Sequence, residues 1–259
     1  GVMYMISDDQ LLNVDQVLKK LKQAIDKKKP FSLVRVGDGE NIILAQNSVM
    51  TMDEVMKEKW ARNANKDRDN KGVTLPNINL RDQMVDAIKK ASIVGIPFYK
   101  NDPILTEDRL KRPLTDRVFK HFGITPKLCC HTFVNRVFVQ RSDFWKALQG
   151  KRILIITKDK WSDKVKKALR KKPYNLNVTM STTFHHHDQM ANTLAFIEAN
   201  KGNYDIALIS CGVNALILAQ KVAETGNIGI DFGKSLMYIV QKKAGLNHFS
   251  RGANKGLIP

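Results

Sequence analysis

The sequence is poor in cysteine, in aromatic residues and in acidic residues, and it contains no long apolar run. Its 259 residues include three cysteines, Cys129, Cys130 and Cys211, and none of them forms a C-x-x-C pair. This odd count argues against a disulfide framework or a cysteine zinc site. No apolar run approaches the roughly 18 residues of a membrane span, and the first residues lack the pattern of a signal peptide. We therefore expect a cytoplasmic protein.

The shortage of acidic residues leaves a large positive charge. There are 43 Lys and Arg residues against 25 Asp and Glu, a formal net charge of +18. The densest stretch, residues 151–172, holds ten basic and two acidic residues. In it, Lys164, Lys167 and Lys171 are spaced to form a stripe on one helix face. Such a field attracts nucleic acid, phosphorylated metabolites or the anionic inner face of a membrane. Because aromatic residues make up only 7% and no nucleic-acid-binding motif is present, we expect membrane contact rather than nucleic acid.

Short apolar runs rich in β-branched residues alternate with amphipathic helical patterns. Strands are predicted at residues 31–36, 92–97, 133–139, 152–157, 177–181, 205–210 and 228–231. Helices are predicted at residues 15–28, 80–91, 106–122, 162–171, 190–200, 213–224 and 234–244, and a long mobile loop at residues 62–72. The alternation predicts an α/β fold in one domain over residues 1–259: a Rossmann-like, doubly wound, mostly parallel sheet with helices on both faces. Ligands bind beyond the carboxyl ends of such strands, so the candidate site residues follow each strand.

The turn after the first predicted strand carries two carboxylates. Gly37 and Gly39 bracket Asp38, and Glu40 follows. Carboxylate oxygens suit Mg²⁺ or Mn²⁺, which complete their coordination with substrate phosphates and water. We expect the two carboxylates to point to one side of an extended turn before a helix that starts at residue 41, with Arg35 binding a phosphate or neutralising the pair. The same pattern also suits an ordinary helix start, where acidic residues are favoured.

A second candidate turn follows the strand at residues 205–210. Gly212 permits close approach of a ligand, and Asn214 caps the next helix or reaches the ligand. Cys211 is interpreted as a packed side chain at the edge of the site rather than a nucleophile, since no basic partner can be inferred beside it. The alternative is an ordinary strand–helix turn.

A third candidate turn follows the strand at residues 228–231. Gly233 precedes Lys234 and Ser235, which are expected to face a diphosphate from the start of a helix. A Walker A loop is excluded because Ile228 stands where that motif requires glycine. Asp231 is expected to accept a hydrogen bond from a hydroxyl group of the ligand, or to cap the helix.

Three further features are weaker candidates. Arg136, in the predicted strand at residues 133–139, is a possible phosphate contact. His185, His186 and His187 follow the fifth predicted strand, but three consecutive histidines in regular structure cannot all face one metal. The Asp-x-Asp segment at residues 67–69 lies among basic residues without a preceding apolar strand, so we do not expect a metal site there.

The three candidate turns together resemble a known family. FSLVRVGDGE at residues 31–40, SCGVNA at residues 210–215 and IDFGKS at residues 230–235 are similar to segments of the GT-D type glycosyltransferases. The resemblance implies a Rossmann-like GT-D fold in which Asp38 and Glu40 form the metal-binding Asp-x-Glu. It also implies transfer of a hexose from a UDP-sugar to an acceptor glycan of a cell surface or glycoprotein, with Mn²⁺ or Mg²⁺ as cofactor and with Asp231 holding the acceptor hydroxyl or the donor sugar. The basic stripe in residues 151–172 extends this expectation to lipid-linked acceptors at an anionic membrane.

Two other functions are open on the sequence. One is a metal-dependent phosphoesterase that uses Asp38 and Glu40, although a second metal ion would need acidic or histidine ligands that the strand ends hardly supply. The other is a basic module that binds nucleic acid through residues 151–172.

Overall fold

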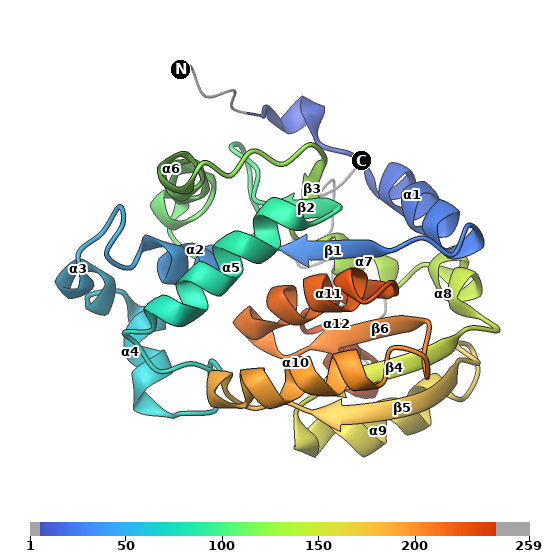
Figure 1. The fold of residues 1–259 in the computed structure, drawn as a ribbon. Helices are drawn as coiled ribbons and strands as arrows, with labels where there is room; N and C mark the ends of the chain where they lie inside the picture. Colours follow the sequence, from blue (N-terminus) through green and yellow to red (C-terminus); the bar gives the residue numbers. More distant parts are fainter. Residues whose placement is uncertain (1–5, 242–259) are drawn as a thin grey trace.

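Seven strands form one parallel sheet in the computed structural model, which describes residues 6–241. The strand order is β3-β2-β1-β7-β6-β4-β5, and every neighbouring pair is parallel. The strands are β1 (Phe31–Arg35), β2 (Ile93–Ile96), β3 (Cys129–His131), β4 (Arg152–Thr157), β5 (Asn177–Thr183), β6 (Ile206–Ser210) and β7 (Ile228–Asp231). The arrowheads of β1 and β5 point to the left in Figure 1, so the carboxyl edge of this parallel sheet lies on that side. This confirms the predicted doubly wound α/β fold.

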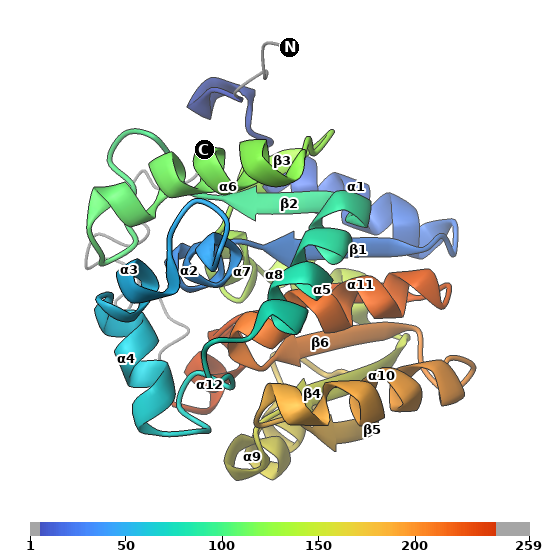
Figure 2. The same cartoon turned by 60° about the vertical axis from the view of Figure 1, so that its left-hand side comes forward.

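Helices cover both faces of the sheet (Figures 1 and 2). One face packs against α2 (Asp38–Ala45), α5 (Ile78–Lys90), α6 (Arg112–Phe122), α10 (Met190–Ala199) and α11 (Ala215–Glu224). The other packs against α1 (Val14–Asp26), α7 (Val134–Phe138), α8 (Ser142–Leu148), α9 (Asp159–Leu169) and α12 (Ser235–Val240). Beyond the carboxyl edge lie α3 (Met52–Met56) and α4 (Lys59–Lys66). Short 3₁₀ turns occupy Asp8–Gln10, Asp108–Leu110, His187–Gln189 and Gly212–Asn214.

The two faces of the sheet have separate hydrophobic cores. Along β4, Leu154 and Ile156 belong to the core with α11, whereas Ile153 and Ile155 belong to the core with α9. Successive side chains of a strand point to opposite faces, so a strand buried on both sides is apolar at every position. This explains why the strands are visible in the sequence as uninterrupted apolar runs.

One predicted strand was wrong. Residues 133–139 contain helix α7, and the neighbouring strand is β3, a few residues earlier. Val134, Val137 and Val139 favour a strand by propensity, but tertiary packing decides otherwise. As a helix, the segment buries Val134 and Phe138, and the ring of Phe138 stacks on Phe144 at 4.7 Å.

The predicted mobile loop at residues 62–72 was also wrong in its first half. Helix α4 extends to Lys66, because its buried residues Ala61 and Ala64 pack into the core beside α2. Several predicted helices differ at their ends. The helix predicted at residues 106–122 begins at Arg112, after a 3₁₀ turn at Asp108–Leu110. Helix α9 ends at Leu169, so Lys171 lies outside it and only Lys164 and Lys167 remain of the predicted stripe. Helix α12 ends at Val240, and residues 242–244 of that prediction lie outside the described residues.

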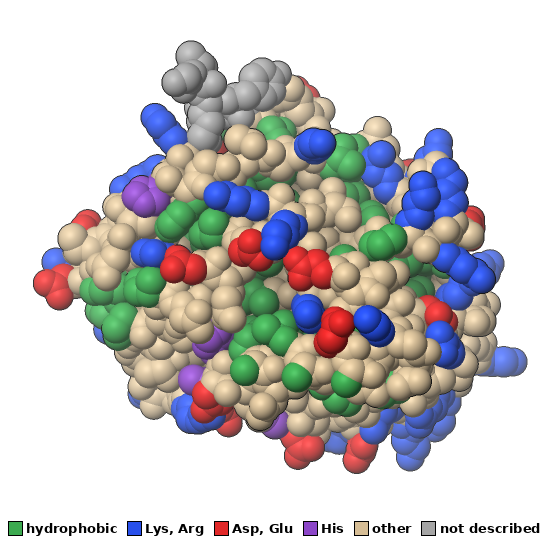
Figure 3. Space-filling view, viewed as in Figure 1, with side chains coloured by type: hydrophobic (Ala, Val, Ile, Leu, Met, Phe, Trp, Pro, Cys, Tyr) green, Lys and Arg blue, Asp and Glu red, His purple; other side chains and the backbone are tan. Residues whose placement is uncertain are grey.

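Basic side chains are spread over the molecule. Figure 3 shows Lys and Arg most densely on the right-hand side of this view, away from the carboxyl ends of the strands. Between residues 6 and 241 there is no helix with the length and apolar character needed to cross a membrane.

The contact between β7 and α11 leaves no room for a side chain at Gly229. A Cβ atom there would lie 2.1 Å from the carbonyl oxygen of Ala219. We expect Gly229→Ala to lower the free energy of unfolding by about 2 kcal/mol or more, because the helix must move off the strand. Gly202→Ala is the control, since no atom lies within 4 Å of its added Cβ. Urea denaturation of both variants tests this, and equal stability would show that α11 does not pack as described.

Candidate functional site

The three candidate turns lie together at the carboxyl edge of the sheet. Strands β1, β7 and β6 are neighbours in that order. The turns that begin at Val36, Phe232 and Cys211 therefore follow adjacent parallel strands. From β1 the chain continues outward to β2 and β3, whereas from β4 it continues outward to β5 on the opposite side of the sheet. Ligands usually bind at such a switch point in a doubly wound fold.

A buried ion pair joins β1 to β7 at this edge. The Nε atom of Arg35 lies 3.5 Å from Oδ1 of Asp231, and the side chains are only 14% and 4% exposed. The backbone amide of Arg35 also donates to Oδ2 of Asp231 at 3.2 Å, and Nη1 donates to the carbonyl of Thr132 at 2.9 Å. Gly233 has φ +54°, and a Cβ atom there would lie 2.2 Å from Nη2 of Arg35. The guanidinium therefore needs glycine at this position.

The Asp38–Glu40 turn differs from the expected extended turn. Helix α2 begins at Asp38, not at residue 41, and Gly37 is its N-cap. Glu40 bends back so that its Oε1 accepts the amide hydrogen of Gly37 at 2.9 Å. Gly39 is in contact with the indole of Trp60, which would lie 2.8 Å from an added Cβ. The two carboxylates thus occupy the first helical turn, with Glu40 acting as an N-terminal capping residue.

Three carboxyl groups crowd this edge. Burial raises the pKa of Asp38 and of Asp231. Burial, together with the charges of Asp231 and Asp38, raises the pKa of Glu40 to about 7 against the hydrogen bond from Gly37 and the charge of Arg35. Carboxylates in this situation are stabilised by a nearby cation.

The donor set suits a metal ion that shares its ligands with a substrate. Over residues 6–241, no group of three or more His, Cys, Asp and Glu side chains is placed to hold a metal ion. Asp38 and Glu40 would supply two carboxylate ligands, which is the number that Mg²⁺ commonly takes from a protein before substrate phosphates and water complete its coordination.

Basic side chains surround the carboxyl groups. Lys71 and Lys111 lie close enough to Asp38 to oppose the rise in its pKa. The pKa of Lys234 is lowered by burial and then by the charges of Lys71, Arg136 and Lys158, while Asp38 opposes this. Burial also lowers the pKa of Arg136, which stacks on the ring of Phe133 with 3.7 Å between Cζ and the ring centroid. Within the described part of the chain, the side-chain ammonium groups of Lys71 and Lys234 have no hydrogen bond or ion pair. Such a group of cations favours an anionic ligand.

Residues 67–77 form a strap over this edge. Lys158 donates from Nζ to the carbonyl of Asp69 at 2.7 Å. The carbonyl of Gly72 accepts from Nδ2 of Asn214 at 2.9 Å and from the amide of His187 at 2.8 Å. These contacts explain why the expected mobile loop is held in place, and they bring Lys71 to the site.

The three histidines hold the strap and its surroundings. Each of them has different partners, so they do not form a shared metal site. In order along the chain, the partners are the amide of Asp159 (3.1 Å), the hydroxyl of Thr74 (3.0 Å), and the side chains of Asn77 (3.1 Å) and Gln83 (2.6 Å). These contacts hold the strap against the segments around it.

The remaining predicted residues lie in or beneath the turns. Cys211 is buried, and burial raises the pKa of its thiol well above the usual value, so it is not a nucleophile. Ser235 is buried, and its hydroxyl accepts from Nδ2 of Asn135 at 2.8 Å. Gly212 has φ +65° and faces the carbonyl of Lys71 in the strap.

Sequence reasoning missed several polar groups at this edge. Lys158 directly follows β4, where the rule applied to the other strands would have found it. Thr157 and Ser210 end two neighbouring strands and face each other in register. Their buried hydroxyl oxygens, and Oδ1 of Asn214, have no hydrogen-bond partner within residues 6–241. Buried polar atoms without a partner are rare in proteins, and their grouping at one edge of the sheet is a notable feature of this edge. No sequence pattern around Lys71 indicates that it belongs to this edge, because only the strap brings it here.

The sequence profile of the GT-D fold-like domain matches residues 12–239. The chain belongs to this family. Three solved structures resemble it at low sequence identity, so they show the fold alone. No curated protein matches the sequence.

The similar structures have closely related descriptions. A glycosyltransferase from Streptococcus sanguinis has a TM-score of 0.56 at 14% identity, over 93% of this chain and 87% of that one. A domain of unknown function 1792, described as having a distinct glycosyltransferase fold, has a TM-score of 0.52 at 14% identity, over 96% and 90%. A selenomethionine-substituted structure of the same domain type has a TM-score of 0.53 at 16% identity, over 90% and 82%. Family and fold together support a glycosyltransferase.

The ion pair between Arg35 and Asp231 should be costly to break from one side. We expect Arg35→Met to lower the free energy of unfolding by about 3 kcal/mol at neutral pH, since it leaves Asp231 buried without its partner. The pKa of Asp231 is already raised, and it should rise further in this variant. The loss should therefore shrink as the pH falls and Asp231 becomes protonated.

Urea denaturation at neutral and acidic pH measures this difference. The double variant Arg35→Met/Asp231→Asn is the control, because it removes both charges and should recover part of the stability at neutral pH. A loss of the same size at both pH values would contradict the assigned ion pair.

Proposed function

We propose that this chain is a metal-dependent glycosyltransferase that transfers a hexose from a UDP-sugar to an acceptor glycan of a cell surface or glycoprotein. The observation that carries the proposal is the crowding of Asp38, Glu40 and Asp231 beside Lys71 and Lys234, whose ammonium groups have no partner within residues 6–241. In a nucleotide sugar with a bound divalent cation, the cation would meet the carboxyl groups and the diphosphate would meet the lysines. Family membership supplies the reaction class.

The proposed transfer moves negative charge onto the leaving group. The bond between the anomeric carbon and the diphosphate oxygen breaks, and its electron pair leaves with UDP. A bond forms from the anomeric carbon to an acceptor hydroxyl oxygen, which gives up its proton. Mn²⁺ or Mg²⁺, when bound, supplies a Lewis acid for the charge on the diphosphate. Asp38 and Glu40 are the residues that would hold it.

The chain's own cations would bind the phosphates from the other side. Lys71 and Lys158 come from the strap and the end of β4, and Lys234 comes from the turn after β7. Arg136 supports them at longer range. The turns that contain Gly37, Gly212 and Gly233 let the backbone approach the donor closely.

Asp231 has a different part in this proposal. Arg35 fixes its carboxylate through a side-chain ion pair and a backbone amide. A carboxylate held in this way can accept a hydrogen bond from a hydroxyl group of the donor sugar or of the acceptor. Asn214 and the hydroxyl groups of Thr157 and Ser210 offer further unpaired polar atoms to the donor.

The other functions are less well supported. A two-metal phosphoesterase requires more ligands than the described residues bring together at this edge. Nucleic-acid binding by α9 is disfavoured because Trp161 is the one aromatic residue in this helix, and a base-stacking surface needs several rings. We propose instead that the exposed Lys164 and Lys167 of α9 contact an anionic membrane that carries the acceptor.

The metal assignment is tested by Asp38→Asn and Glu40→Gln. We expect each variant to lower the rate of Mn²⁺-dependent UDP release from a UDP-hexose by about 100-fold or more, as for other losses of electrostatic stabilisation in a transition state. Thermal stability should stay equal or rise, because an amide removes a carboxyl group whose charged form burial disfavours.

The control is Asp163→Asn, at a carboxylate that is 98% exposed on α9. It should keep the wild-type rate. Full activity of both site variants after removal of divalent cations would show that the metal assignment is wrong.

A further inference from the structure

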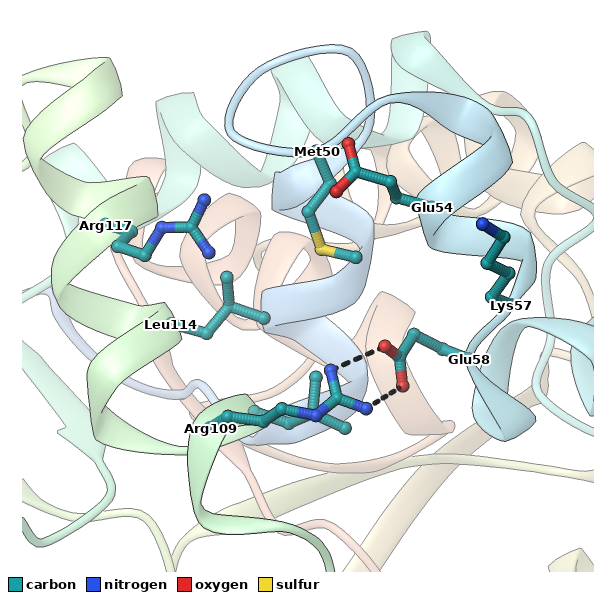
Figure 4. A pocket seen from close by; sticks show the side chains of 8 residues that line it. Met50, Glu54, Lys57, Glu58, Arg109, Leu114 and Arg117 are labelled. Carbon is teal, nitrogen blue, oxygen red and sulfur yellow. Dashed lines mark hydrogen bonds and ion pairs between the residues drawn. The ribbon is translucent and has the colours of Figure 1, made fainter.

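A separate pocket lies beside the carboxyl edge, between α3, the start of α4 and α6. It has a volume of about 450 Å³. This is within the range of small-molecule sites, roughly 300–1,000 Å³. Figure 4 shows its lining: Met50 and Leu114 in the middle, Arg117 on one side, Glu54, Lys57 and Glu58 on the other, and Arg109 below.

The polar groups of the pocket are held in place before any ligand arrives. Arg109 donates from Nη1 and Nη2 to both carboxylate oxygens of Glu58, at 2.6 and 3.0 Å. Glu54 is fixed by the amide of Thr51 at 3.0 Å, and Arg117 by the carbonyl of Val49 at 2.9 Å. Donors and acceptors thus surround an apolar floor. Oppositely charged groups largely balance, so the pocket does not select a strong anion or cation.

The walls of this pocket are connected to the helix that carries Asp38. Leu110 lines the pocket, and the next residue, Lys111, is close enough to Asp38 to affect its pKa. Asn41, one helical turn after Asp38, donates to the carbonyls of both, at 3.1 and 3.2 Å. On the other wall, Trp60 follows Glu58 by two positions and packs against Gly39. A ligand in the pocket would therefore be next to the proposed donor site.

We propose that this pocket binds a sugar residue of the acceptor glycan. A sugar ring offers hydroxyl groups that both donate and accept hydrogen bonds, and a C–H face that packs on apolar side chains. The polar rim around Met50 and Leu114 matches that combination. The proposal rests on the proposed function, since it names the acceptor side of the same reaction.

Saturation-transfer NMR with glucose, galactose and N-acetylglucosamine as probes tests the pocket without donor or metal. We expect at least one of these sugars to receive saturation from the wild-type protein. Arg117→Met should weaken that binding about tenfold or more, the effect of losing a hydrogen bond to a charged group. Met50→Trp, which fills the floor, should abolish it.

Arg170→Met is the matched control. Arg170 is also an exposed arginine that donates to one backbone carbonyl, that of Val178 at 2.8 Å, and it lies just after α9. It should bind the probe sugars as the wild type does. Circular dichroism checks that each variant is folded.

The inference is overturned if none of the sugars binds, or if Arg117→Met and Met50→Trp bind them as well as Arg170→Met does. Displacement of the bound probe sugar by inorganic phosphate would also overturn it, in favour of an anion site. Failure of the proposed function is a different result: a wild-type protein that binds sugars in this pocket yet neither binds nor turns over a UDP-hexose.

Discussion

The carboxyl edge of the sheet depends on the balance between three carboxyl groups and one arginine. Strands β1 and β7 bring Asp38, Glu40 and Asp231 together, and burial raises the pKa of each. Arg35 offsets part of this cost through its contact with Asp231, but it is committed to that residue and to the carbonyl of Thr132. The pKa values of Asp38 and Glu40 stay raised although Arg35, Lys71 and Lys111 lie near them, so a further cation would stabilise their charged forms. In a fold that places ligands at this edge, we take these raised pKa values as the reason why a divalent cation belongs to the proposed reaction.

The strap at residues 67–77 brings positive charge to the part of this edge where the diphosphate is proposed to bind. Its backbone is held by Asn214, His187 and Lys158, and these contacts keep Lys71 near Lys234. Like charges repel, so the folded chain bears a cost at this point that a bound diphosphate would remove. The histidines and Asn214 contribute by holding the strap.

Much of the fold could be predicted from the sequence, because strands buried on both faces leave long apolar runs. The runs that became β1, β4, β6 and β7 lie close to their predicted positions. The edge strand β3 has only three residues and left no such run, while the valines around residue 137 suggested a strand where packing against Phe144 makes a helix. Propensity is a weak guide when tertiary contacts decide.

The site was predictable only in part for a related reason. Asp231 ends a strand, and Asp38, Gly212 and Lys234 lie within three residues of strand ends, so the parallel topology alone brings them together. Lys71 reaches the site through a strap whose position depends on hydrogen bonds to residues far along the chain, and no local pattern reveals it. The same holds for the acceptor pocket, which is built from three separate helices and turns. For Arg136 the predicted strand was wrong, because the segment is a helix, but the residue still lies near Lys234 at this edge.

The central claim is that the carboxyl edge binds a divalent cation and a nucleotide diphosphate together. Electron paramagnetic resonance of Mn²⁺ tests it directly, because the signal of the free ion falls as the ion is bound. Two protein carboxylates should take up Mn²⁺ weakly, and addition of UDP should increase its binding strongly as phosphate oxygens complete the coordination. We predict a marked loss of free Mn²⁺ signal when protein and UDP are both present, beyond the sum of the losses with each alone. An unchanged signal in that mixture, or binding that ignores UDP, would contradict the account.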